Sequence, residues 1–353
     1  MSARWWRTPG KTDCAMASND HRTPWDQTHF IILAGALGSG KTTLLEAFIN
    51  APGIRATTAV IINEAGAINI DGAILSDSAK GLAMATLSNG CVCCSLTNDL
   101  VFTVEELIAS RANADLPPLT TLVLECSGLS KPGPIIRSLT GLAELRMRVS
   151  VVSTLDCSRE VGAGGDAEAE FAQLAAAQTI VLTKVDGVSD DAREQYADSI
   201  RYFNPFATVI NETEPACRLA WTRFNERNER PLPPISRITS QAVQHPRINV
   251  FHARLANPEW EDVQDWLENV AGVLGERLLR IKALVNDPHD GCVLLQSVGS
   301  TFSAARRLQQ TSTQATSVVF IVRDSDVSVL ANIETHMTVS WGSLDERSLG
   351  DCQ

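Results

Sequence analysis

The residues best suited to chemistry lie in a glycine-rich segment near the start of the chain. Residues 35–42 read GALGSGKT and match the pattern G-x-x-x-x-G-K-[ST]. Its glycines let backbone N–H groups surround a β-phosphate, while Lys41 can reach the β- and γ-phosphates and the Thr42 hydroxyl can ligate Mg²⁺. A β-branched and aromatic run precedes this segment and helical spacing follows it, so the context is strand, loop and helix. The segment therefore predicts a site for a nucleoside triphosphate.

An acidic residue follows a second apolar run. Residues 121–125 read TLVLE, a strand pattern that ends in Glu125, and Gly128 follows three residues later. A carboxylate at such a strand end can hold Mg²⁺ through water, and the Gly128 N–H would then lie near the γ-phosphate. The alternative is that Glu125 only caps a turn.

A base-recognition segment follows a third apolar run. Thr183-Lys184-Val185-Asp186 resembles the N/T-K-x-D signature, in which the aspartate accepts hydrogen bonds from guanine N1–H and the exocyclic amine. Adenine cannot offer these two donors, so Asp186 would favour guanine. Thr183 replaces the commoner asparagine, and its hydroxyl can make only part of the same contact. The tetrapeptide is weak evidence alone and gains weight from its order after the phosphate loop.

Three of the nine cysteines lie within four positions, in the segment LSNGCVCCSL. Cys91 and Cys93 share one face in extended backbone, and three thiolates suit Zn²⁺ by default. Together with Cys94 they make three protein ligands, which leave one of the four coordination positions of the metal open, as in a transfer site. A buried inert cluster or a redox pair is the alternative. The nine cysteines are too few and too clustered for a disulfide scaffold in a chain of 353 residues.

Taken in order, these motifs resemble the CobW-type GTPases, a metallochaperone branch of the P-loop proteins that is related to the urease and hydrogenase nickel-insertion GTPases. The resemblance covers about residues 29–340. The matching blocks read GALGSGKTTLL, INEAGAINIDGAIL, LSNGCVCCSL, LECSGLSKPGPII and LTKVD, with RLLRIKALV and SVVFIVRD near the C-terminus.

The resemblance implies a role for each motif residue. Lys41, Thr42 and Glu125 would serve catalysis, with Thr42 and Glu125 at Mg²⁺. Asn63, Glu64 and Asp71 would lie in a switch segment. GTP would be bound by Gly35, Gly38, Ser39, Gly40, Lys41, Thr42, Thr43, Thr183, Lys184 and Asp186, and Zn²⁺, or Co²⁺ or Ni²⁺ in its place, by Cys91, Cys93 and Cys94. Two departures are Ala65 where the family commonly has Phe, and six scattered histidines in place of a His-rich stretch.

Strand and helix patterns alternate from residue 29 to about 210, which predicts a parallel sheet with helices on both faces. A smaller α+β domain of the CobW C-terminal type is expected after it. The expected strands are 29–34, 58–62, 121–125, 149–155, 179–183 and 206–210, and the expected helices 42–50, 97–112, 134–145, 166–177 and 190–202. The domains would be a disordered tail over 1–28, a GTPase domain over 29–212, a linker over 213–245 and the C-terminal domain over 246–350.

Composition narrows the class of protein. The net charge of −11 argues against a broad nucleic-acid binder, and no run of 18 apolar residues suggests a membrane span. The N-terminus lacks the apolar stretch of a signal peptide, so a cytoplasmic protein is expected.

The expected partners are GTP, a divalent metal and a client metalloprotein, and a nucleotide-dependent homodimer stays open. Alternatives are an activator for one metalloenzyme of the cobalt nitrile hydratase or cobalamin-synthesis type, a regulatory GTPase with structural cysteines, and an ATP-driven kinase.

Overall fold

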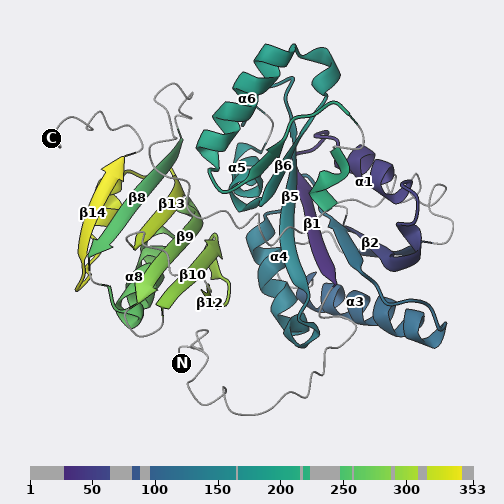
Figure 1. Cartoon of the computed structure of the whole chain (residues 1–353), viewed down its shortest axis with the longest axis horizontal. Helices are drawn as coiled ribbons and strands as arrows, with labels where there is room; N and C mark the ends of the chain where they lie inside the picture. The colour runs from purple at the N-terminus through teal and green to yellow at the C-terminus, as the bar shows by residue number, and fades with distance from the viewer. Residues whose placement is uncertain are drawn as a thin grey trace. The chain divides into compact units, whose positions relative to one another are not determined.

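The protein divides into two compact units, each built around its own sheet (Figure 1). The computed structural model describes residues 28–63, 82–87, 96–163, 166–214, 218–222, 247–256, 258–287, 291–308 and 316–343. The tail expected over 1–28 and the linker expected over 213–245 lie mostly outside these residues. The domain boundaries therefore stay a prediction.

The first unit contains a seven-stranded sheet in the order β3-β2-β4-β1-β5-β6-β7, and every neighbouring pair is parallel. This confirms the predicted fold class. In chain order the strands are β1 (His29–Gly35), β2 (Thr58–Asn63), β3 (Ala83–Leu87), β4 (Thr121–Glu125), β5 (Arg148–Asp156), β6 (Thr179–Thr183) and β7 (Thr208–Ile210). Because the strands are parallel, all their carboxyl ends meet at one edge, where ligands bind in open α/β sheets.

Helices cover both faces of this sheet. The α-helices are α1 (Lys41–Ile49), α3 (Leu96–Asn113), α4 (Pro132–Ser138), α5 (Ala167–Ala176) and α6 (Asp190–Phe203). Leu44, Leu45 and Phe48 of α1 pack with Ile31 and Val60 in one apolar core. Figure 1 shows α4 and α5 on the other side of the sheet from α1. This arrangement explains why the inner strands read as continuous apolar runs.

Two elements differ from the sequence expectation. The patterns did not predict β3, whose residues AMATL have weak strand propensity and pair with β2 at the edge of the sheet. The helix expected over 134–145 is broken, because α4 ends at Ser138 and a 3₁₀ segment, η3, covers Leu139–Leu145. Inside that segment Leu142 has a non-helical φ of −104°.

The second unit is an antiparallel sheet in the order β11-β10-β9-β13-β8-β14, with β12 paired to β10. The helix α8 (Trp260–Leu274) packs its apolar face on one side of this sheet, around Ala253, Ile281 and Phe320. The other strands and the short helix of this unit are β8 (Ile248–Ala256), β9 (Leu278–Asp287), β10 (Gly291–Val298), β11 (Thr301–Phe302), β12 (Arg306–Arg307), β13 (Ser317–Arg323), α9 (Val327–Ala331) and β14 (Thr338–Ser343). Besides η3, the 3₁₀ segments described along the chain are η2 (Arg55–Thr57), η4 (Val185–Gly187), η5 (Leu219–Thr222) and η8 (Gly275–Arg277). The expected α+β architecture is present.

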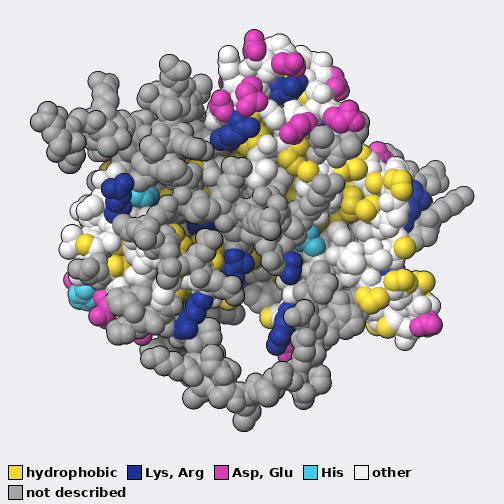
Figure 2. Space-filling model, viewed as in Figure 1, with side chains coloured by type: hydrophobic (Ala, Val, Ile, Leu, Met, Phe, Trp, Pro, Cys, Tyr) yellow, Lys and Arg dark blue, Asp and Glu magenta, His cyan; other side chains and the backbone are white. Residues whose placement is uncertain are grey.

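One group of acidic side chains stands out on the face of the molecule shown in Figure 2. Figure 2 shows carboxylate side chains gathered over α6, where Asp190, Asp191, Glu194 and Asp198 are exposed. None of the helices described in this structure combines the length and the apolar composition that crossing a bilayer requires.

Candidate nucleotide and metal site

The phosphate loop connects the end of β1 to the start of α1. Gly35 closes β1 with φ +141°, and a Cβ built there would lie 2.2 Å from Thr154 Oγ1 of β5. Only glycine fits this approach between the two strands. Ser39, also in the loop, is buried, and its hydroxyl shares a 2.6 Å hydrogen bond with the same threonine hydroxyl. The loop is thus anchored on β5 before any ligand binds.

Lys41 lies folded over the phosphate loop. Its ammonium donates hydrogen bonds to the carbonyl oxygens of Gly35 at 2.8 Å and Ala36 at 3.1 Å, and the residue is 8% exposed. The charge is therefore held inside the curve of the loop, where the motif predicts that phosphates bind.

The structure brings together the two residues that the sequence assigned to Mg²⁺. Thr42, in the first turn of α1, donates from Oγ1 to Glu125 Oε1 at 2.7 Å. Glu125 is the last residue of β4, lies opposite Leu33 of β1, and is 4% exposed. A hydroxyl and a carboxylate are hard oxygen donors, so this pair fits the ligand chemistry of Mg²⁺.

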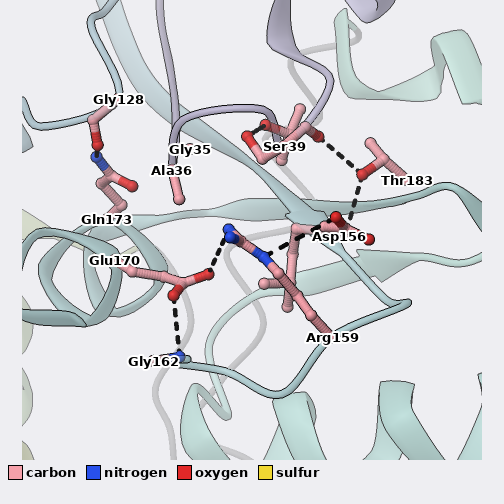
Figure 3. A network of polar contacts seen from close by, with 12 residues as sticks. Gly35, Ala36, Ser39, Gly128, Asp156, Arg159, Gly162, Glu170, Gln173 and Thr183 are labelled. Atoms are coloured by element: carbon pink, nitrogen blue, oxygen red, sulfur yellow. Dashed lines mark hydrogen bonds and ion pairs between the residues drawn. The ribbon is translucent and has the colours of Figure 1, made fainter. Parts of the chain in front are cut away.

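The segment after Glu125 lies tightly against the phosphate loop. A Cβ on Gly128 would lie 2.5 Å from the backbone nitrogen of Leu37. From the other side, the buried Gln173 of α5 donates from Nε2 to the carbonyls of Gly128 at 3.0 Å and Ser130 at 2.9 Å. The Gln173–Gly128 contact is drawn in Figure 3. Sequence reasoning missed Gln173, whose helix position carries no motif.

The base-recognition segment is tied to the phosphate loop. Thr183 ends β6, and its hydroxyl lies 2.7 Å from Ser39 O and 3.1 Å from Leu155 O (Figure 3). The Lys184 ammonium is 2.6 Å from Asp156 Oδ2, and Asp186 is exposed. Sequence reasoning also missed Asp156, although an acid at the end of the strand pattern 149–155 was a usable signal.

The predicted metal ligands Cys91, Cys93 and Cys94 lie outside the described residues, as do Glu64 and Asp71. Asn63, the other predicted switch residue, is the buried last residue of β2. Among the residues that the structure describes, no group of three or more His, Cys, Asp and Glu side chains could hold a metal ion.

The described cysteines do not resemble metal ligands. Cys126, Cys157 and Cys292 are buried. Burial raises the pKa of Cys126 to about 12, with nearby Lys41 opposing and Glu125 adding to the effect. Cys126 therefore stays a protonated thiol at neutral pH, whereas the form of cysteine that binds metal is the thiolate.

Comparison with protein families covers both units. Residues 29–211 match the model described as CobW/HypB/UreG, nucleotide-binding domain. The chain belongs to this family. Residues 249–333 match the cobalamin synthesis protein cobW C-terminal domain. The family therefore places the chain among the P-loop GTPases, as the motifs predict, and the resemblance inferred from the sequence is confirmed.

Named relatives of this CobW-family chain include zinc chaperones. The zinc chaperone CobW of Pseudomonas aeruginosa is 29% identical over 85% of this chain and 89% of its own length. The zinc chaperone YjiA of Escherichia coli is 32% identical over 52% of this chain and 56% of its own length. A zinc-regulated GTPase metalloprotein activator of Schizosaccharomyces pombe is 28% identical over 55% of this chain and 48% of its own.

Among solved structures, the Zn(II)-bound YjiA GTPase of Escherichia coli superimposes with a TM-score of 0.62 at 21% identity, covering 87% of this chain and 99% of that one. At this identity the likeness concerns the fold, and it extends across both units of the CobW-family architecture.

Proposed function

We propose that this CobW-family GTPase is a metallochaperone. It binds Zn²⁺, or a similar divalent metal, at Cys91, Cys93 and Cys94, and delivers it to a client metalloprotein under the control of GTP. Relatives named as zinc chaperones and as a zinc-regulated metalloprotein activator support the zinc cargo and the client. A cytoplasmic location belongs to the same proposal, since a reducing compartment keeps the thiols available.

One observation carries the proposal. The strand β3 ends at Leu87 beside Asn63 of β2, and both strands are parallel to β4 and β1. The segment that carries the three cysteines therefore starts from the same edge of the sheet as the phosphate loop and Glu125. The phosphate loop, Glu125 and the start of this segment thus share one edge of the sheet, which supports coupling between nucleotide and metal.

In the proposed hydrolysis step, Lys41 and the amides of the loop orient the γ-phosphate for attack by water. Thr42 and Glu125 would hold Mg²⁺, which when bound neutralises charge that develops on the β- and γ-phosphate oxygens. When the nucleotide binds, Lys41 must exchange its carbonyl partners in the loop for phosphate oxygens. The ammonium thus replaces hydrogen bonds that it already makes.

Nucleotide control requires that metal affinity differ between nucleotide states. By linkage, metal must then change nucleotide affinity by the same factor. The direct test is an anaerobic titration with Zn²⁺, Co²⁺ and Ni²⁺, with and without a non-hydrolysable GTP analogue. We expect one high-affinity ion per chain, with an affinity that changes at least about fivefold when the analogue is bound.

The triple replacement of Cys91, Cys93 and Cys94 by Ser should abolish this binding, while Cys352→Ser, a thiol outside the motif, should leave it intact. If the triple variant loses stability but keeps the metal affinity of the parent chain, the cysteines are structural and the protein is a regulatory GTPase of another kind.

Base recognition by residues 183–186 is a second part of the proposal. Asp186→Asn should weaken GTP binding by at least about tenfold, because the amide no longer accepts both hydrogen bonds from guanine. Asp191→Asn, an exposed acid at the start of α6, is the matched control and should bind GTP normally. Equal affinity for ATP and GTP in the unmodified chain would favour the kinase alternative instead.

A further inference from the structure

A buried carboxylate that belongs to none of the sequence motifs lies under the base-recognition segment. Asp156 is the last residue of β5, and its side chain is 5% exposed. Besides the Lys184 ammonium at 2.6 Å, it accepts hydrogen bonds from the backbone N–H of Ser158 at 3.0 Å and from the Ser158 hydroxyl at 2.6 Å. Burial acts to raise the pKa of Asp156, but these donors outweigh it, and the pKa lies below its ordinary value.

A second buried carboxylate holds this arrangement in place. Glu170 of α5 is 3% exposed, accepts the N–H of Gly162 at 2.9 Å and pairs with Arg159 Nη2 at 3.4 Å. The Arg159 Nε in turn lies 3.9 Å from Asp156 Oδ2, so the guanidinium stands between the two acids (Figure 3). The positive side chains of Lys184 and Arg159 thus face two buried carboxylates, and Asp156 cannot move without breaking these contacts.

The partner of Asp156 occupies a sensitive position. Lys184 has a left-handed backbone, with φ 55° and ψ 33°, and its side chain is 52% exposed. It stands two residues before Asp186, whose exposed carboxylate has no ion pair within the described part of the chain. The lysine stem is long and flexible, so without another partner its ammonium could reach this neighbouring carboxylate. The buried Asp156 is that partner.

We infer that Asp156 is a positioning residue of the nucleotide site. It binds the Lys184 ammonium, which fixes the lysine stem and leaves the Asp186 carboxylate available to the guanine donors. This inference rests on the proposed role of residues 183–186 in base recognition. Asp156 itself touches no nucleotide atom in this scheme and acts only through Lys184.

The test compares GTP with inosine triphosphate, which lacks the exocyclic amine that Asp186 would accept. Asp156→Asn should weaken GTP binding about tenfold and should reduce the ratio of GTP to inosine triphosphate affinity. The reason is that the released ammonium competes for Asp186. Fluorescence titration with both nucleotides measures this ratio. Adding Lys184→Met to Asp156→Asn should recover part of the lost preference for GTP. Methionine keeps most of the lysine stem but has no ammonium to compete for Asp186.

Controls separate positioning from simple destabilisation. Asp166 caps the start of α5 by accepting the N–H of Ala169 at 3.0 Å. Asp166→Ala removes this cap, so it should lower stability and leave the nucleotide ratio unchanged. Should Asp156→Asn not fold, Ser158→Ala removes one hydrogen bond from the same carboxylate and should shift the ratio in the same direction, by about threefold.

An unchanged ratio in the folded Asp156 or Ser158 variant would overturn the inference, provided that Asp186→Asn does lose its preference for GTP. If Asp186→Asn keeps that preference, the base-recognition assignment itself fails, and the role of Asp156 fails with it.

Discussion

At the scale of single residues, the hydrogen bond from Thr42 to Glu125 is the contact that most directly joins the two halves of the candidate Mg²⁺ site. It connects the first turn of α1 to the end of β4 at 2.7 Å, across residues that are 83 positions apart. Both oxygens are thus oriented in advance. Little side-chain rearrangement is then needed when the ion and the nucleotide bind.

Thr42→Ala should therefore remove most of the Mg²⁺ dependence of GTP-analogue binding. We expect the affinity measured in chelator to be unchanged, and kcat with Mg²⁺ to fall by about 100-fold or more. Thr103→Ala, which deletes a threonine hydroxyl that donates to Asp99 O within α3, is the matched control. Retention of the full Mg²⁺ effect in Thr42→Ala would contradict the assignment.

A buried histidine makes stability depend on pH. His29 begins β1, is 7% exposed, and lies 2.6 Å from the Ser150 hydroxyl through Nε2. Burial, above all, lowers its pKa from 6.5 to about 4; the Thr222 backbone contact opposes this shift and Arg148 reinforces it. His29 is therefore neutral in the folded chain at neutral pH, while the unfolded chain protonates it below pH 6.5.

The free energy of unfolding should then fall as the pH is lowered from about 6.5 to about 4, and this term should be constant above pH 6.5. One extra proton bound by the unfolded chain gives a slope of about 1.4 kcal/mol per pH unit. Urea unfolding of His29→Gln at pH 7 and pH 5 should show a smaller pH dependence than the unmodified chain. The exposed His336→Gln is the control, and an identical slope in all three proteins would refute the prediction.

At the scale of elements, α5 connects two parts of the site. Its Gln173 holds the carbonyls of Gly128 and Ser130, and its Glu170, one turn earlier, holds the loop that carries Arg159. Lys131, next to Ser130, is also paired with Glu168 of α5 at 2.5 Å. The helix thus contacts both the segment from Gly128 to Lys131 and the loop of Arg159, which lies against Asp156.

Gln173→Ala should destabilise the parallel-sheet unit by about 2 kcal/mol, because two buried carbonyls lose their donor. Gln173→Met keeps most of the volume and should lose a similar amount if the hydrogen bonds dominate. Chemical unfolding measures both. A much smaller loss in the methionine variant would show that packing, rather than the amide, accounts for the effect.

At the scale of the whole molecule, the two units have separate apolar cores. One forms around α1 and the parallel strands and includes Phe48 and Trp221, and the other forms around α8 and includes Trp266 and Phe320. The two cores share no residue. All the residues predicted to bind nucleotide lie in the first unit, so a bound nucleotide should stabilise that unit directly.

Calorimetry should consequently resolve two unfolding transitions. GDP with Mg²⁺ at 100 times its Kd should stabilise only one of them, by about 2.7 kcal/mol. The fragment 28–230, which keeps Trp221 in this core, should reproduce the transition that shifts. One cooperative transition that moves as a whole would show that the units do not unfold independently.

Much of the fold follows from local pattern. The strand that leads into the phosphate loop and the strands that end at Glu125 and Thr183 are continuous apolar runs. Such runs can be recognised in the sequence without knowing which strands lie beside them. The edge strand β3 and the strand β14 could not be predicted in this way. Their residues, AMATL and TVSWGS, form strands because a partner strand offers its edge.

The sequence by itself determined which segments are candidates for chemistry: a phosphate loop, an acid predicted to hold Mg²⁺, a tetrapeptide predicted to read guanine and a cysteine triplet. Each can be recognised because its residues are close together in the chain. Only the tertiary structure decided which distant residues support them. Asp156 lies 28 positions from Lys184, and Gln173 lies 45 positions from Gly128. Such contacts depend on how parallel strands bring their ends to one edge, and no local pattern encodes that.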